Sequence, residues 1–367
     1  AARQMRVLNT NTRYLNDLLT HYAERLLATL PRELEVCYVL NSASEGNELA
    51  LRLARAYTGE RDMVVLEAAY HGNTTSLIDI SPYKHNGPGG KGPPDWVHVA
   101  ALPDVYRGAY RASEPDAGAM YAASVLAAIE LTASAGRGIA GFIAETCPSV
   151  GGQLVFPPGY LAHVYHHVRA AGGVCIADEV QTGLGRMGTS FWAFEAQGVV
   201  PDIVVMGKPL GNGHPLAAVA TTRAIADAFD NGMEFFSTFG GNTVSCAVGL
   251  AVLDVVRDER LQERARQVGD DMGARLRALA TRHDIVGDVR GSGLFWGVEL
   301  VRDRSTLGPA GAEAGFVANR MRERGILLGT DGPYHNVVKI RPPMPFTADD
   351  GNLVVLELES ALRQLPG

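Results

Sequence analysis

The sequence predicts an α/β protein with a mostly parallel sheet, followed by a smaller α+β domain at the C-terminal end. Short apolar runs typical of strands recur at 36–40, 63–67, 139–145, 173–179 and 202–207. Amphipathic stretches typical of helices lie between them, at 45–57, 119–135 and 158–171. Near-continuous apolar strands that alternate with helices are typical of a parallel sheet covered on both faces.

The pattern changes near residue 260. A long charged helix is expected at 259–281, then strands in GLFWGVELV and VVKIRP, then helices at 309–324 and 347–363. We therefore expect a helical segment at 1–30, a large domain at 31–258 and a small C-terminal domain at 259–367. The chain begins with AARQMRVLNT, without Met and already in a helical pattern, so we expect that a preceding part of the first segment is missing.

The bulk composition narrows the function classes. The 367 residues are 46% apolar and 20% charged, with a net charge of −7, which is ordinary for a globular protein. No basic stripe is visible, so nucleic acid is not an expected partner, and no apolar run approaches the roughly 20 residues of a membrane span. We expect a cytoplasmic protein with reduced thiols and no metal, because its cysteines are scattered in apolar settings: Cys37, Cys147, Cys175 and Cys246.

Polar and glycine-rich residues follow the expected strands, where doubly wound sheets bind their ligands. In NSASEGNE, Ser42, Ala43 and Ser44 would lie at a helix N-terminus, a ready site for an anion. An ordinary N-cap role explains Ser44 equally well. In AAYHGNT, Tyr70 and His71 follow the second strand; an aromatic ring there can stack on a planar ligand or simply pack within the loop.

Two further strand ends carry reactive groups. CIADEVQTG places Asp178 at a strand end, although an ordinary capping acid would explain an isolated Asp-Glu pair. MGKPLGNGHP places Lys208 after another strand, in a chain where only four of 33 basic residues are lysines. Lysine, unlike arginine, can lose its proton and act as a nucleophile or base. Together these positions favour a ligand with a phosphate, a flat ring, a ring nitrogen and an aldehyde. Pyridoxal 5′-phosphate has all four features.

The succession of NSASEGNE, AYHG, AETCPSVGGQ, IADEVQTGLGRMG, DIVVMGKPLGNGHPLAAV and STFGGN resembles the class III aminotransferases over essentially the whole chain. These are pyridoxal-phosphate enzymes of the aspartate-aminotransferase fold, fold type I. The resemblance implies that Lys208 forms the Schiff base with the cofactor and that Asp178 pairs with its ring nitrogen. It implies a homodimer, or a tetramer, with active sites shared between subunits. The other implied cofactor contacts are Ala43, Ser44, Tyr70, His71, Glu145, Gln181 and, across the subunit boundary, Thr238.

A narrower resemblance concerns the substrate. SLIDISPYK, WVHVAALPDVYRGAYR and FGGNTVSCAVGLAVLD are similar to the phospho-lyase branch of that class, which acts on ethanolamine phosphate or 5-phosphohydroxylysine. In the turn after the lysine, Asn212 and His214 either hold a substrate phosphate or shape the turn. Arg341, in KIRPPMPFT, aligns with the arginine that holds a substrate carboxylate in many transaminases, and its guanidinium suits a phosphate equally well.

These resemblances imply a pyridoxal-phosphate-dependent carbon–oxygen lyase. By β-elimination it would convert ethanolamine phosphate to acetaldehyde, ammonia and phosphate. The alternative is an amine or ω-amino-acid transaminase on the same scaffold. A third interpretation, a non-catalytic cofactor-binding or regulatory module, would leave Lys208 unexplained, and no DNA-binding extension accompanies it.

Overall fold

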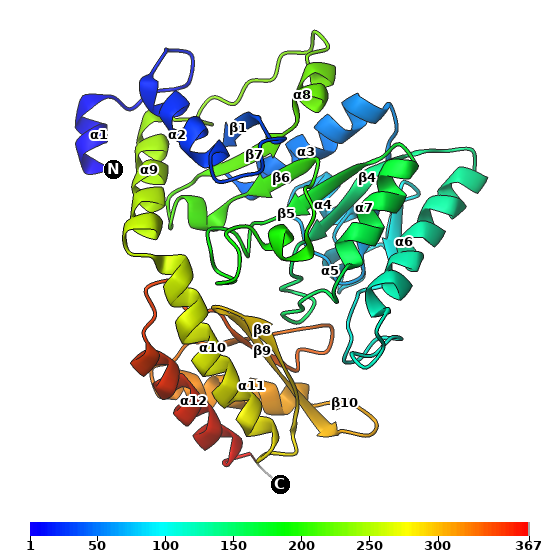
Figure 1. Cartoon of the computed structure of the whole chain (residues 1–367), viewed down its shortest axis with the longest axis vertical. Helices are drawn as coiled ribbons and strands as arrows, with labels where there is room; N and C mark the ends of the chain where they lie inside the picture. The colour runs from blue at the N-terminus through cyan, green and yellow to red at the C-terminus, as the bar shows by residue number, and fades with distance from the viewer. Residues whose placement is uncertain (366–367) are drawn as a thin grey trace.

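The computed structural model describes residues 1–365 and shows two sheets, each packed against helices (Figure 1). Within these residues the larger sheet has seven strands in the order β1-β7-β6-β5-β4-β2-β3. The five strands from β3 to β6 pair in parallel, whereas β7 runs antiparallel to both β6 and β1. The predicted mostly parallel α/β sheet is therefore confirmed. Its strands are β1 (Val36–Leu40), β2 (Asp62–Leu66), β3 (Val97–Ala100), β4 (Ile139–Glu145), β5 (Val174–Asp178), β6 (Ile203–Met206) and β7 (Ala217–Thr221).

Helices cover both faces of the larger sheet. On one face, α3 (Ala43–Thr58) packs with α4 (Thr75–Asp79) and α8 (Arg223–Phe229) over alternate strand residues such as Val65 and Val205. On the other face lie α6 (Ala117–Ser134) and α7 (Tyr160–Ala170), and beside them α2 (Asp17–Leu27) and α9 (Thr243–Asp258). The remaining short elements are α1 (Ala2–Val7), α5 (Pro82–His85), η1 (Ala193–Gln197) and η2 (Lys208–Leu210).

The smaller sheet is antiparallel throughout and lies below the larger one in Figure 1. Its order is β10-β9-β12-β11, with β8 paired to β9. Three helices pack against it around a core that includes Trp296 and Leu358. The domain limits predicted above stay predictions. The elements of the larger sheet come before the junction of α9 and α10, and those of the smaller sheet come after it. The elements are α10 (Leu261–Ala280), β8 (Val286–Ser292), β9 (Phe295–Asp303), β10 (Gly308–Pro309), α11 (Gly311–Glu323), β11 (Gly329–Asp331), β12 (Val337–Ile340) and α12 (Ala348–Leu362).

One helix in residues 1–365, α6, has the length and apolar composition of a membrane span, with a mean hydropathy of 1.3 over 18 residues. The sequence analysis did not expect such a run. In the fold α6 packs against α7, and its Tyr121, Val125 and Ile129 are buried in the core. A core helix passes the same test of composition, so this is weak evidence for a membrane segment.

Candidate active site

The carboxyl ends of three neighbouring strands open onto one cavity of about 500 Å³. Glu145 and Asp178 are paired in register at the ends of β4 and β5, and Lys208 follows the end of β6. Parallel strands deliver their end residues to the same sheet edge, which explains this convergence. The predicted residues that line the cavity are Ala43, Ser44, Tyr70, His71, Glu145, Asp178, Gln181, Lys208 and His214.

Asp178 is buried and held from several sides. Its Oδ2 accepts a hydrogen bond from Asn47 Nδ2 at 3.0 Å and lies 2.9 Å from His71 Nδ1. Its Oδ1 accepts the backbone N–H of Val180 at 3.2 Å. Asn47 Nδ2 also donates to the carbonyl of His71 at 2.7 Å, so the strand end and the 70–73 loop are tied together. These contacts fix the direction in which the carboxylate faces the cavity.

Lys208 adopts an unusual backbone conformation, with φ at 30°, at the start of the 3₁₀ turn η2. A side chain at the preceding Gly207 would place its Cβ 2.8 Å from Cβ of Ala43, so glycine lets the chain pass against the start of α3. The side chain of Lys208 is reached by solvent from the cavity, yet the surrounding protein desolvates it and lowers its pKa. The charge of Arg341 acts in the same direction and that of Asp178 opposes it. A lysine with a lowered pKa is ready to act as a nucleophile or base.

Glu145 supports the wall of the cavity rather than pairing with a cation. It is 3% exposed and accepts the backbone N–H groups of Tyr70 at 3.3 Å and Ser149 at 3.2 Å. Burial, and next to it the charge of Asp178, raise the pKa of Glu145 to about 7. The acid therefore holds the backbone of Tyr70 at the cavity while its own charge is disfavoured.

The N-terminus of α3 forms an anion-binding corner of the cavity. Its N-cap is Ser42, whose side chain accepts the N–H of Glu45 at 3.2 Å, so the N-cap interpretation of Ser44 is wrong. Ser44 instead lies in the first helical turn, where backbone N–H groups lack partners within the helix. Gly72, with φ at 144°, packs so closely that a Cβ there would lie 2.7 Å from Ser44 Oγ. A helix N-terminus lined by small residues suits a phosphate.

A second cavity of about 970 Å³ shares Gln181 and Lys208 with the first, and Asn212 and Arg341 line it. Asn212 and Arg341 therefore lie in a cavity that also borders Lys208. Asn212 has φ at 45°, and His214 Nε2 lies 2.9 Å from Ser245 Oγ, so both residues also shape the turn. Their roles toward a substrate stay predictions.

Thr238 lies outside both cavities. It is exposed in the loop before α9, where its carbonyl accepts the N–H of Thr12 at 3.3 Å. This position is compatible with a contact to a neighbouring subunit, and that contact stays a prediction.

The sequence analysis assigned no role to Asn47 or Arg186. Asn47 lies four residues after Ala43 on α3, and a polar residue on the buried face of a helix was the available signal. Arg186 follows the glycine-rich loop, and its Nη1 donates to the carbonyls of Leu294 at 3.1 Å and Pro342 at 2.8 Å. Burial, and next to it the charge of Arg341, lower the pKa of Arg186 to about 10.

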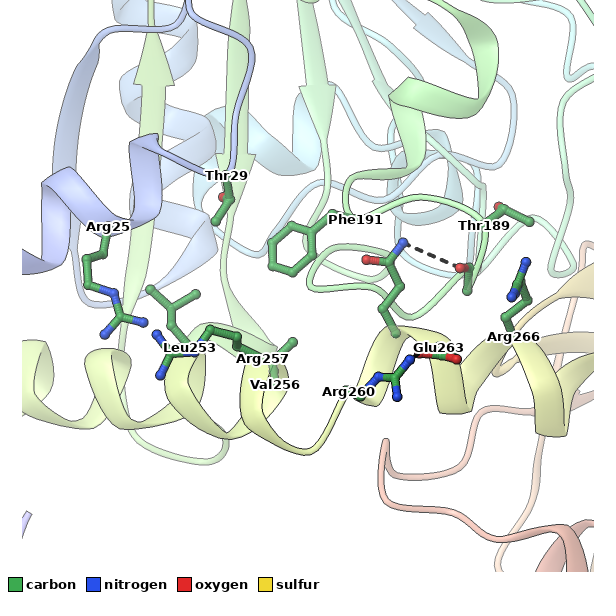
Figure 2. Close-up of a pocket in the computed structure, with 12 residues that line it drawn as sticks. Arg25, Thr29, Thr189, Phe191, Leu253, Val256, Arg257, Arg260, Glu263 and Arg266 are labelled. Atoms are coloured by element: carbon green, nitrogen blue, oxygen red, sulfur yellow. Dashed lines mark hydrogen bonds and ion pairs between the residues drawn. The ribbon is translucent and has the colours of Figure 1, made fainter.

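A further cavity of about 720 Å³ lies at the elbow between α9 and α10 (Figure 2). Arginines from both helices and from α2 line it, and three of these four arginines form ion pairs within residues 1–365. Arg25 and Arg257 both contact Asp254, at 2.8 and 3.0 Å, and Arg260 pairs with Glu263. Across residues 1–365, no cluster of three or more His, Cys, Asp or Glu side chains could hold a metal ion. The smaller cavity at the sheet edge, not this one, carries reactive groups.

The geometry can be set beside known proteins. The sequence model of the family described as aminotransferase class-III matches residues 2–362. A Drosophila melanogaster protein named alanine–glyoxylate aminotransferase 2-like is 46% identical over 366 residues, covering 98% of this chain and 74% of that protein. A Caenorhabditis elegans protein named ethanolamine-phosphate phospho-lyase homolog 1 is 43% identical over 377 residues, covering 99% of this chain and 79% of that protein.

Solved structures give the same picture. A phospholyase from Arthrobacter in complex with phosphoethanolamine superposes with a TM-score of 0.93 at 41% identity, over 100% of this chain and 86% of its own. An amine transaminase from an uncultivated Pseudomonas species, in its pyridoxal-phosphate-bound form, superposes with a TM-score of 0.90 at 30% identity, over 100% of this chain and 86% of its own.

Proposed function

The chain belongs to the class-III aminotransferase family, and from this premise we propose that it is a phospho-lyase that eliminates phosphate from a phosphorylated amino alcohol. Its cofactor is pyridoxal 5′-phosphate. The substrate proposed for testing is ethanolamine phosphate, because the similar phospholyase from Arthrobacter was solved with phosphoethanolamine. The products would be acetaldehyde, ammonia and inorganic phosphate.

The residues of the smaller cavity fit this cofactor. In the described part of the chain, three buried polar atoms of residues that line the cavity have no hydrogen-bond partner: Asn47 Oδ1, His71 Nε2 and Gln181 Oε1. The start of α3 offers N–H groups to a phosphate, and Asp178 offers a carboxylate to a ring nitrogen. The proposed cofactor contacts are Ala43, Ser44, Tyr70, His71, Glu145, Asp178, Gln181, Lys208 and the partner subunit's Thr238.

The reaction proposed here needs a base, an electron acceptor and a grip on the leaving group. The bound cofactor supplies an electron-accepting ring in conjugation with the substrate amine. Lys208, with its lowered pKa, removes the proton from the carbon that bears the amine. Asp178 would pair with the ring nitrogen of the bound cofactor and stabilise its protonated form. The carbon–oxygen bond breaks, the phosphate leaves with the electron pair, and water converts the released enamine to acetaldehyde and ammonia.

One observation in the structure supports an anionic substrate. Arg341 lines the substrate side of Lys208 and forms no ion pair within residues 1–365, so its charge is free for a ligand. Nearby Lys339 is instead paired with Asp331 at 2.7 Å. A free guanidinium binds phosphate or carboxylate in a bidentate manner, which supports an anionic substrate and leaves the transaminase as the alternative.

The transaminase alternative is kept because the 46%-identical relative is named an aminotransferase. Incubation of the holoenzyme with ethanolamine phosphate and no keto acid separates the two. The lyase releases inorganic phosphate over many turnovers. A transaminase releases no phosphate and transfers the amine to pyruvate, and this outcome would overturn the proposal. The Lys208→Ala variant is the control for phosphate released without the enzyme.

A further inference from the structure

We propose that Lys84 binds the phosphate of the substrate and thereby selects phosphorylated amines. This inference rests on the proposed function, and it concerns a residue to which neither the sequence analysis nor the family resemblance gave a role. Its starting point is the distribution of lysine. Of the four lysines in the chain, Lys208 lines the site described above, Lys339 is near enough for its charge to act on Lys208, and Lys84 lies beside Tyr70.

The position of Lys84 is set by two aromatic rings. Its Nζ lies 5.7 Å from the centroid of the Tyr70 ring and 5.3 Å from that of Tyr83. The two rings meet edge to face, with centroids 6.2 Å apart at 81°. Tyr70 lines the cofactor cavity, so the ammonium lies beside a ring that forms part of the cavity wall.

The short helix α5, which carries Lys84, is tied to the cavity wall by backbone contacts. The N–H of Tyr83 donates to the carbonyl of Ala69 at 3.2 Å. Ser81, at the start of α5, accepts the N–H of His71 through its hydroxyl at 3.0 Å. These contacts hold helix α5 against the 69–71 loop. The backbone of Lys84 is therefore fixed, while its flexible side chain leaves the ammonium free to move.

The charge of Lys84 is available to a ligand. Over the described range 1–365, no carboxylate lies within 4.0 Å of its ammonium, whereas Lys339 is paired with Asp331. Lys84 is exposed, and only ring faces contact its charge. Attraction to aromatic rings is weaker than a charge-assisted hydrogen bond to phosphate, so a phosphate ester that enters the cavity can draw the ammonium from the rings.

Lysine suits this task for a chemical reason. Its ammonium is a compact point charge with three rotatable donors on a flexible stem, which can follow the tetrahedral oxygens of a phosphate as it departs. Arg341 is a planar fork that also fits the carboxylate of an amino acid. A second cation beside the cavity wall favours the dianionic phosphate over a monoanionic carboxylate, because the electrostatic attraction grows with ligand charge.

The experiment compares Lys84→Gln with Lys91→Gln, a matched control. The control removes the same charge from the Gly- and Pro-rich loop that follows α5. The first readout is the dissociation constant of inorganic phosphate for the holoenzyme, by calorimetry. The second is KM for ethanolamine phosphate in phosphate release. We expect Lys84→Gln to raise both roughly tenfold to a hundredfold, as for the loss of one charged hydrogen bond, and Lys91→Gln to leave both unchanged.

The visible absorption of the bound cofactor must be the same in both variants, which excludes a displaced Tyr70 as the cause. Lys84→Arg is expected to keep both constants within about threefold of the wild-type values, because it retains the charge. If Lys84→Arg loses as much as Lys84→Gln, packing against the tyrosines is the cause and the inference is overturned. Unchanged constants in Lys84→Gln overturn it as well.

The outcomes for Lys84 and for the proposed function are separable. If the wild-type enzyme releases no phosphate from ethanolamine phosphate but Lys84→Gln weakens the binding of inorganic phosphate, the lyase proposal fails and the Lys84 site stands. If the wild-type enzyme releases phosphate and Lys84→Gln matches it in both readouts, the lyase stands and the Lys84 site fails.

Discussion

The cavity at the edge of the larger sheet and the cavity at the α9–α10 elbow differ in how they treat charge. In the elbow cavity, which is larger, arginines at the surface face nearby carboxylates such as Asp254 and Glu263. In the sheet-edge cavity, Asp178 and Glu145 are buried and held by hydrogen bonds to neutral groups and to His71. The cavity with the reactive groups is therefore the one whose buried acids are held in place without a Lys or Arg partner, and it is not the larger cavity.

The largest effect that would test this contrast is expected from Lys208→Ala. Loss of the amine would remove both the proposed covalent partner of the cofactor and the proposed base, so phosphate release should fall by at least roughly 10⁴-fold. The visible absorption of the cofactor should change together with the activity. A variant that keeps more than a tenth of the wild-type rate would show that the reaction does not depend on this lysine.

Asp178→Asn is expected to cost roughly 10²–10⁴-fold in kcat, because an amide cannot stabilise a protonated ring nitrogen. Asn47 and His71 remain to hold the side chain, so the cofactor should still bind, as measured by its absorption after gel filtration. Asn47→Ala is a useful comparison. It removes a hydrogen bond to Asp178 but keeps the carboxylate, so it should lower kcat less than Asp178→Asn does. Equal rates for Asp178→Asn and the wild type would contradict the assignment.

Glu145 predicts a pH dependence of stability in the cofactor-free protein. Its pKa is raised from 4.5 to about 7, so the folded state holds the proton more tightly than the unfolded state does. The contribution of Glu145 to the free energy of unfolding is fully present below pH 4.5 and is lost as the pH rises through about 7. The loss should approach roughly 3 kcal/mol.

Urea unfolding of the wild type and of Glu145→Gln across this pH range measures the Glu145 contribution. The difference between the two should grow in favour of Glu145→Gln as the pH rises. Parallel curves would mean that Glu145 does not titrate in this window.

Arg341→Gln is expected to raise KM for ethanolamine phosphate roughly tenfold to a hundredfold, since one charged hydrogen-bonding partner is lost. Binding of an unphosphorylated amine such as ethanolamine should be unaffected, and this supplies the control. An equal loss for both ligands would show that Arg341 supports the cavity as a whole instead of the anion.

The smallest effect is expected from a substitution in the elbow cavity. Arg257→Ala removes an exposed partner of Asp254 and Asp258, and the free energy of unfolding should change by less than about 1 kcal/mol. Phosphate release should be unchanged. A measurable loss of activity would show that the elbow cavity takes part in function and would break the contrast drawn above.

Much of this fold and site was predictable from local signals. The strand at 36–40 and the strand end at Glu145 were predicted as found, because long apolar runs and the groups that follow them are local features. The antiparallel strand β7, Ala217–Thr221, was not predicted. Its run LAAVAT directly follows the glycine turn, and pairing direction depends on contacts distant in the chain.

The parts of the site that could not be predicted depend on tertiary contacts. Ser42 and not Ser44 caps α3, a difference of two residues within a run of small polar residues that all suit the position. Asn47 meets Asp178 across 131 positions of sequence, and Arg186 reaches the carbonyl of Pro342 across 156. No local pattern reports such distances, so these residues become visible only in the folded chain.

Lys208 follows β6 of the larger sheet, whereas Arg341 follows β12 of the smaller one. The proposed base and the proposed anion contact therefore follow strands of different sheets, and the chain passes from the larger sheet to the smaller one where α9 ends and α10 begins. The spacing between these two side chains depends on how the two sheets pack together, so we expect amino-acid changes at that packing surface to alter which length of substrate fits, while Lys208 and Asp178 stay unchanged. We therefore expect that substitutions outside the cavity around Lys208 can change substrate selectivity.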